Sequence, residues 1–143
     1  MSEESTTRGL EDKVRRSIDA FPRGDFDAVM SPYTPNAVWD MSAVGLGVYE
    51  GREAIRGYFE EWRGSYEDFE QVLEEFHDLG NGVTLAVIRQ RARLRSSSGF
   101  VEQRYAGVAI WSNALLERAT TYNDIDEARA AAERLAEERG RNG

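Results

Sequence analysis

The chain has 143 residues, a formal net charge of −8, a pI near 4.8, no cysteine and one histidine. The absence of cysteine excludes disulfides, thiolate metal sites and cysteine nucleophiles, and one histidine excludes a metal site with several histidine ligands from one chain. The acidic balance argues against a nucleic-acid surface, because phosphate binding depends on clustered lysines and arginines.

The length fits a single domain, which can bury about two-thirds of the surface of its unfolded chain. We expect this domain to span residues 8–139, with a disordered tail at residues 1–7 and a flexible tail at residues 140–143. No apolar run approaches the roughly 20 residues of a membrane span, and the N-terminus lacks the basic and apolar segments of a signal peptide. These features predict a cytoplasmic protein without membrane contacts.

The first third of the chain predicts two helices and a short strand. Apolar side chains recur at helical spacing from Arg8 onward, and Pro22 ends this first helix. Asp25 is placed to cap a short second helix that begins at Phe26. The alternation of residues 37–41 then predicts a short strand that presents its tryptophan and methionine on one side.

A third helix is expected to follow the Gly-rich loop at residues 45–47 and to open at residues 50–53. Its apolar face is broad and carries three aromatic side chains, at Tyr58, Phe59 and Trp62. Residues 69–79 fit both a helix and a strand. We favour a strand because Asn81-Gly82 follows, which is a strong signal for a β-hairpin.

Three long β-compatible runs, at residues 83–94, 100–111 and 115–123, predict two successive hairpins. Strands of this length exceed the usual five to six residues and must twist and curve, which gives the sheet a hollow face. Asp124 with Glu127 resembles a capping box and opens a last helix that extends to about Arg139.

The arginines on two of these strands predict which face is hollow. If the turn at residues 96–99 is symmetric, Arg93 lies opposite Glu102 and Gln90 lies opposite Tyr105. Because side chains alternate, Arg89, Arg91, Arg93 and Arg95 share one face, and burying four guanidinium groups without partners would be too costly. The inward side chains are then Ala86, Ile88, Gln90, Ala92, Gln103, Tyr105, Gly107, Ala109 and Trp111.

Four segments, residues 24–29, 36–40, 49–55 and 122–124, resemble the SnoaL-like family of the nuclear-transport-factor-two-like superfamily. The resemblance covers about residues 8–136. It implies an α+β, cone-shaped fold in which N-terminal helices pack on a strongly curved antiparallel sheet with a C-terminal helix. Relatives in this superfamily include polyketide cyclases, ketosteroid isomerases, scytalone dehydratase and limonene epoxide hydrolase. On the last strand the resemblance places Glu117, Ala119, Thr121 and Asn123 inward.

Enzymes of this superfamily typically use a carboxylate in the cone as acid or base, together with a polar group that holds substrate or water. Asp40 and Glu117 are the candidate carboxylates, with Tyr105 as a candidate partner. Asp40 lies beside the position of the ketosteroid isomerase base, which falls on Met41, and a solvated Asp40 or Glu117 is the competing interpretation. The only histidine, His77, is expected at the surface.

The remaining candidate residues would bind a mostly hydrophobic ligand through aromatic rings and a few hydrogen bonds. They are Trp39, Met41, Tyr58, Phe59, Trp62, Gln90, Gln103, Trp111, Thr121 and Asn123. Two functions stay open. The first is a cofactor-independent acid-base enzyme of the isomerase, cyclase or hydrolase type that acts on a polyketide-, steroid- or terpenoid-like molecule. The second is a non-catalytic ligand-binding or structural module of the same fold.

We expect no cofactor and no metal ion. The resemblance implies a homodimer that pairs through the outer sheet face. That face combines arginines and Glu102 with the apolar Val87, Val108 and Ile110, a mixture suited to a symmetric interface.

Overall fold

The computed structural model describes residues 3–142, which form four α-helices, one short 3-10 helix and six strands. In chain order these are α1 (Glu3–Ala20), α2 (Phe26–Met30), β1 (Tyr33–Asp40), η1 (Ser42–Val44), β2 (Val48–Glu50), α3 (Arg52–Gly64), β3 (Tyr66–Gly80), β4 (Val83–Leu94), β5 (Val101–Ser112), β6 (Leu115–Tyr122) and α4 (Ile125–Asn142). No helix within these residues is long and apolar enough to cross a membrane.

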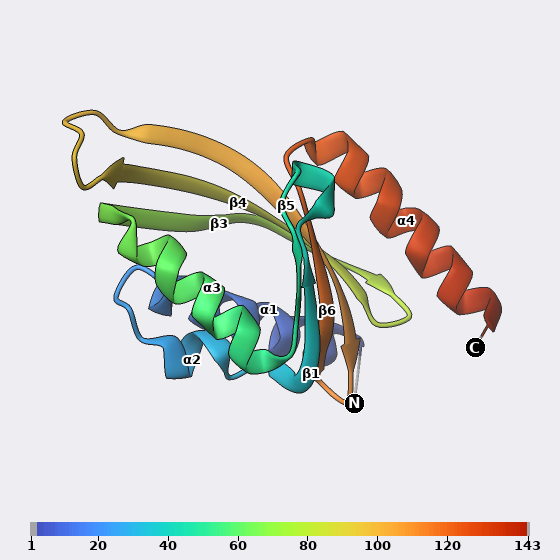
Figure 1. Cartoon of the computed structure of the whole chain (residues 1–143). Coiled ribbons are helices and arrows are strands. Elements are labelled where there is room, and N and C mark those ends of the chain that lie inside the picture. The colour runs from blue at the N-terminus through green and yellow to red at the C-terminus, as the bar shows by residue number, and fades with distance from the viewer. Residues whose placement is uncertain (1–2, 143) are drawn as a thin grey trace.

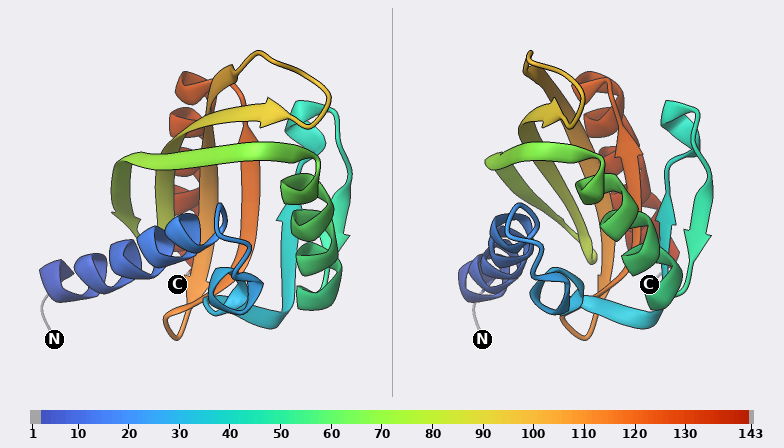
Figure 2. Two further views of the ribbon diagram at one scale, coloured as in Figure 1. Left: turned by 90° about the vertical axis from the view of Figure 1, so that its left-hand side faces the viewer. Right: turned by 60° about the vertical axis from the view of Figure 1, so that its left-hand side comes forward.

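All six strands join one bent, open sheet in the order β2-β1-β6-β5-β4-β3. Strands β3 to β6 are antiparallel to one another as expected, but β1 lies parallel to β6, so the sheet is mixed. The long strands β3, β4 and β5 curve over α1, α2 and α3, which lie on the concave side (Figure 1). Helix α4 lies on the opposite face of the sheet (Figure 2).

Residues 69–79, whose sequence fitted both a helix and a strand, lie in strand β3. The turn that follows them explains why this segment is extended. Asn81 and Gly82 both have positive φ angles, of 57° and 77°, which is the backbone of the tight turn that joins two twisted strands. A Cβ atom on Gly82 would also lie 2.7 Å from the carbonyl oxygen of Trp111. The hairpin prediction is therefore confirmed.

The ends of several elements differ from the sequence prediction. Helix α1 begins at Glu3 and α4 continues to Asn142, where the sequence predicted a first helix from about Arg8 and a last helix that ends at about Arg139. Residues 1–2 and 143 of the two expected tails lie outside the described residues. Strand β1 begins at Tyr33, before Pro35, because its pairing with β6 is irregular between Tyr33 and Val38. A proline tolerates such an irregular stretch, where no regular ladder needs its missing N–H.

The register of β4 against β5 differs from the symmetric-turn prediction by two residues. Arg91 lies opposite Glu102 and Ile88 lies opposite Tyr105, where the prediction paired Arg93 with Glu102. Ala92 pairs with Val101, so the connection between the strands is residues 93–100 and its centre lies one residue earlier than predicted, which moves the pairing by two residues. A shift of two residues leaves every side chain on its original face, because the side-chain period of a strand is two. The inward and outward assignment of these strands therefore holds although the pairing was wrong.

Helix α4 covers part of the outer sheet face. Ala128, Ala132 and Ala136 repeat every four residues along α4 and are buried against the sheet. Small side chains at this spacing form one stripe, and the stripe packs closely on the strands. The sheet residues beneath it include Val87 and Val108, which are buried here and are not open to a dimer partner as the sequence suggested.

Phe21 lies where the helical layer meets the sheet. Its ring contacts four aromatic rings, with centroid distances of 5.8 Å to Phe26, 5.6 Å to Phe59, 5.1 Å to Trp62 and 5.0 Å to Phe69. These partners belong to α2, α3 and β3. One buried ring thus joins three elements, and aromatic pairs at such distances add to the gain from burial.

Replacing Phe21 by alanine should lower the free energy of unfolding by roughly 3–5 kcal/mol, because it leaves a cavity among four rings. Chemical denaturation measures this change. Glu53→Ala, at an exposed position of α3, is the matched control and should change stability by about 0.5 kcal/mol or less. Equal losses in the two variants would contradict this description of the core.

Candidate functional site

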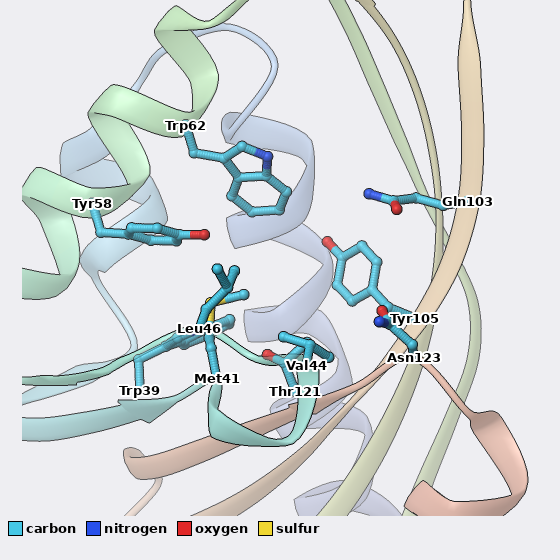
Figure 3. Close-up of a pocket in the computed structure, with 10 residues that line it drawn as sticks. All are labelled: Trp39, Met41, Val44, Leu46, Tyr58, Trp62, Gln103, Tyr105, Thr121 and Asn123. Carbon is cyan, nitrogen blue, oxygen red and sulfur yellow. The ribbon is translucent and has the colours of Figure 1, made fainter.

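A cavity of about 240 Å³ opens between α3, the loop around η1 and the inner face of the sheet (Figure 3). Its lining comes from five separate parts of the chain, and the tertiary fold brings them together. The lining residues are Trp39, Met41, Val44, Leu46, Tyr58, Trp62, Gln103, Tyr105, Thr121 and Asn123.

Local geometry explains why these side chains converge. Tyr58 and Trp62 are four residues apart on α3 and therefore share one face of the helix. Gln103 and Tyr105 alternate along β5 with outward residues, and Thr121 occupies the same inner face on β6. Figure 3 shows the hydroxyl of Tyr58 and the amide of Gln103 directed into the space between α3 and the sheet.

Two lining residues, Val44 and Leu46, were missed by the sequence analysis, which treated residues 45–47 only as a flexible loop. The loop is held closed by two backbone hydrogen bonds of 3.0 Å between Met41 and the residues Leu46 and Gly47. Leu46 is 51% exposed at the rim of the cavity. No local signal in the sequence pointed to these two residues, because single exposed apolar residues are common on protein surfaces.

Of the thirteen candidate residues, eight line this cavity: Trp39, Met41, Tyr58, Trp62, Gln103, Tyr105, Thr121 and Asn123. Three others lie in the interior away from its wall. Phe59, Gln90 and Trp111 are at most 4% exposed, and Trp111 Nε1 donates a hydrogen bond of 2.8 Å to Thr84 Oγ1.

Asp40 lies on the outer side of the sheet, in a groove against α4, and does not reach the cavity. Its carboxylate accepts hydrogen bonds from the Ser42 hydroxyl at 2.6 Å, the Ser42 backbone N–H at 2.9 Å and Arg118 Nη2 at 2.6 Å. The bonds from Ser42, with a further contribution from Arg118, lower the pKa of Asp40 below its ordinary value. Asp40 is thus held in its ionised form as part of the scaffold.

Glu117 is exposed and does not line the cavity, which corrects its inward placement. The reason is a β-bulge. Ile110 pairs with Arg118 but Trp111 pairs with Leu116, so Glu117 is an extra residue without a partner on β5. The bulge turns Leu116 inward and leaves Glu117 in solvent, which a strict alternation from Thr121 could not predict.

The tyrosines of the cavity are hydrogen-bonding groups and poor bases. Tyr105 donates its hydroxyl proton to Gln71 Oε1 at 2.8 Å. Burial raises the pKa of Tyr105 and also that of Tyr58. Both hydroxyl groups therefore stay protonated at neutral pH.

His77 lies at the exposed end of β3, where its Nε2 is 2.9 Å from Glu75 Oε1. Hydrogen bonds from His77 and Arg129 lower the pKa of Glu75 to about 2. This pair lies outside the cavity.

A second cavity of about 90 Å³ lies deeper between α1 and the sheet, and Trp39 borders both cavities. Two buried polar atoms have no hydrogen-bond partner among the described residues: Trp39 Nε1 and Gln90 Oε1. A buried group left in this state costs roughly 1–3 kcal/mol, so each has a strong preference for a partner.

None of the ten lining residues of the main cavity is an Asp, Glu, His, Lys or Arg. The wall combines aromatic and aliphatic surface with hydroxyl, indole and amide groups, and it offers no anionic ligands for a metal ion. Chemically, this arrangement suits an uncharged molecule that is mostly apolar and forms a small number of hydrogen bonds.

The sequence of residues 14–114 matches the SnoaL-like domain family. No curated protein sequence matched the chain.

Solved structures share the fold at low sequence identity. A protein with a ketosteroid isomerase-like fold from Catenulispora acidiphila, in complex with trimethylamine, has a TM-score of 0.70 at 12% identity, covering 85% of this chain and 92% of that one. An LEH-like epoxide hydrolase from M. tuberculosis has a TM-score of 0.68 at 16% identity, covering 90% and 92%. TerC, co-crystallised with polyporic acid, has a TM-score of 0.70 at 12% identity, covering 88% and 98%.

Replacing Asp40 by asparagine should destabilise the protein at pH 7 by roughly 1–3 kcal/mol, because it removes charge-assisted hydrogen bonds. The pKa of Asp40 is lowered in the folded state, so its stabilisation is present above the ordinary aspartate pKa of about 3.9 and is lost as the pH falls through the lowered value. Urea denaturation of both proteins at neutral and at acidic pH should therefore show a gap that narrows in acid.

The control is Asp27→Asn. Asp27 pairs with Arg56 at 2.6 Å but its side chain is 89% exposed, so its removal should cost about 1 kcal/mol or less. A gap between the wild type and Asp40→Asn that stays constant with pH would contradict the scaffold role of this carboxylate.

Proposed function

The chain belongs to the SnoaL-like domain family, and from this premise we propose that it binds a small, uncharged and mostly apolar molecule in the cavity beneath α3. The observation that carries the proposal is the composition of the wall. Ten residues from five parts of the chain line the cavity, and none of them is an Asp, Glu, His, Lys or Arg. Charged ligands would lose their hydration there without a compensating partner.

The chemistry of the wall also indicates how a ligand would be held. Tyr58 and Trp62 offer flat aromatic surface, while Gln103, Thr121 and Asn123 offer hydrogen-bonding groups on the opposite side (Figure 3). A planar or polycyclic body fits between such walls, with polar substituents toward β5 and β6. Polyketide-, steroid- and terpenoid-like molecules have this character.

Two proteins of the same fold support a role in small-molecule binding, since one was solved with trimethylamine and another with polyporic acid. The two ligands differ widely in size and polarity. The fold thus supplies a hollow, and the side chains of each chain select what enters it.

Ligand binding is favoured over acid-base catalysis because both candidate carboxylates lie outside the cavity. Asp40 is bound to Ser42 and Arg118 on the outer face, and Glu117 is exposed on a bulge. An enzyme of this fold without an interior carboxylate would have to rely on hydroxyl groups such as that of Tyr105 as hydrogen-bond donors. This remains the alternative function.

The proposed homodimer would use the part of the outer sheet face that α4 leaves open. Arg89 and Arg104 lie there around Glu74, with N···O distances of 3.7 Å and 2.7 Å, and Val72 beside them is 47% exposed. Arg91 lies 3.8 Å above the ring of Phe100. Both charge signs and exposed apolar groups in one patch allow the patch to pair with a second copy across a two-fold axis.

Nile red, a neutral and apolar dye, should bind with micromolar affinity and quench tryptophan fluorescence, because Trp39 and Trp62 line the cavity. Glucose 6-phosphate and ATP should not compete. Leu46→Asp places a charge at the rim and should weaken dye binding about tenfold or more.

Val48→Asp is the matched control, because Val48 is 48% exposed nearby but does not line the cavity. Equal weakening by both substitutions, or displacement of the dye by ATP, would reject this site. Turnover of an aryl epoxide that is lost in Tyr105→Phe while dye binding persists would instead favour the enzyme alternative.

Sedimentation at micromolar concentration should give about twice the chain mass of 16.2 kDa. Val72→Lys should shift the population to monomer by placing a charge at the proposed contact. Leu115→Lys, at a 37% exposed site at the start of β6, should leave the dimer intact. A wild-type monomer would exclude the assembly.

A further inference from the structure

The deep cavity is more apolar than the main one. Its wall includes Val14 and Ile18 from α1 and Ala86 and Ile88 from β4. With a volume of about 90 Å³ it exceeds the share of one water in the liquid, about 30 Å³, and apolar cavities of this kind bind apolar groups in preference to water. A short hydrocarbon chain matches both its volume and its wall.

Small residues of the sheet create this space. Gly107 on β5 lies between Ala86 on β4 and Thr121 on β6, in direct register with both. A Cβ atom built on Gly107 would meet no atom within 4 Å. The glycine therefore leaves room that its neighbours do not fill, and larger side chains at this position would occupy the deep cavity.

Trp39 is the residue that the two cavities share. Its ring packs edge-on against Phe59 at a centroid distance of 4.9 Å, while its buried Nε1 has no acceptor among the described residues. Buried indole N–H groups are normally paired. An acceptor atom on a molecule that passes from one cavity into the other can satisfy this donor.

We propose that the main and deep cavities form one two-compartment site for an elongated, uncharged ketone or ether. A ring system occupies the main cavity, an alkyl chain enters the deep cavity beside Gly107, and the oxygen between them accepts a hydrogen bond from Trp39 Nε1. The inference rests on the proposed function, which by itself requires only the main cavity.

A series of alkyl phenyl ketones, from acetophenone to octanophenone, tests the deep compartment by titration calorimetry. Affinity for the wild type should rise by up to about fourfold for each methylene that is buried. Gly107→Val should abolish this rise and leave the affinity for acetophenone unchanged, because only the alkyl chain meets the new side chain. Thr120→Val, which faces the outer groove on β6, should behave as the wild type.

Thermal melting and circular dichroism establish that Gly107→Val is folded, and Gly107→Ala is the milder second variant, which should shorten the longest chain accepted. Matched ketone and alkylbenzene pairs of equal length test the donor. The affinity for the ketone divided by that for the alkylbenzene should fall about five- to tenfold in Trp39→Phe. It should not change in Trp62→Phe, since Trp62 borders only the main cavity.

The outcomes separate the two proposals. If acetophenone and Nile red bind but chain length has the same effect in the wild type and in Gly107→Val, the two-compartment site is wrong and the binding function stands. An unchanged ketone preference in Trp39→Phe overturns the assignment of the donor. If neither the ketones nor Nile red bind, both proposals fail.

Discussion

The separation of the two faces of β4 and β5 is the constraint on which the structure depends. Ile88, Gln90 and Ala92 point to the helical layer, and Arg89 and Arg91 point away from it. Because side chains alternate along a strand, either the arginines or the apolar side chains must face the helices. Guanidinium groups among the aromatic rings would lose their hydration, which costs a large amount of free energy. The orientation of the sheet, and with it the side on which the helices enclose a cavity, follows from this cost.

Each face then has a different character. The inner face is buried under aromatic side chains and encloses neutral cavities, whereas the outer face is divided between an alanine stripe on α4 and a network of arginines and glutamates. The arginines of this network are about half exposed, and ion pairs open to solvent contribute little to stability. Their position beside the exposed Val72 is the basis of the proposed pairing with a second copy of the chain.

The cavity is neutral because neither candidate carboxylate, Asp40 or Glu117, lines it. Arg118 and Ser42 hold Asp40 on the outer side of β1, and a single extra residue in β6 turns Glu117 into solvent. Two local features thus remove both acidic candidates from a hollow that the fold would otherwise offer for acid-base chemistry. Among the described residues, the two buried polar atoms without a hydrogen-bond partner, Trp39 Nε1 and Gln90 Oε1, are also uncharged.

The sequence by itself determined the kind of each long element, the Asn81-Gly82 hairpin, the family, the faces of β4 and β5, and most of the cavity wall. These features follow from local propensity or from the period of two along a strand, and both depend only on residues that are close in the sequence. The tertiary structure alone decided the register of β4 on β5, the bulge at Glu117, the cover that α4 places over Val87, and the partner of Asp40, which lies 78 residues away in the chain. Pairing between distant segments is selected by the packing of the whole sheet, so no local pattern of residues contains it.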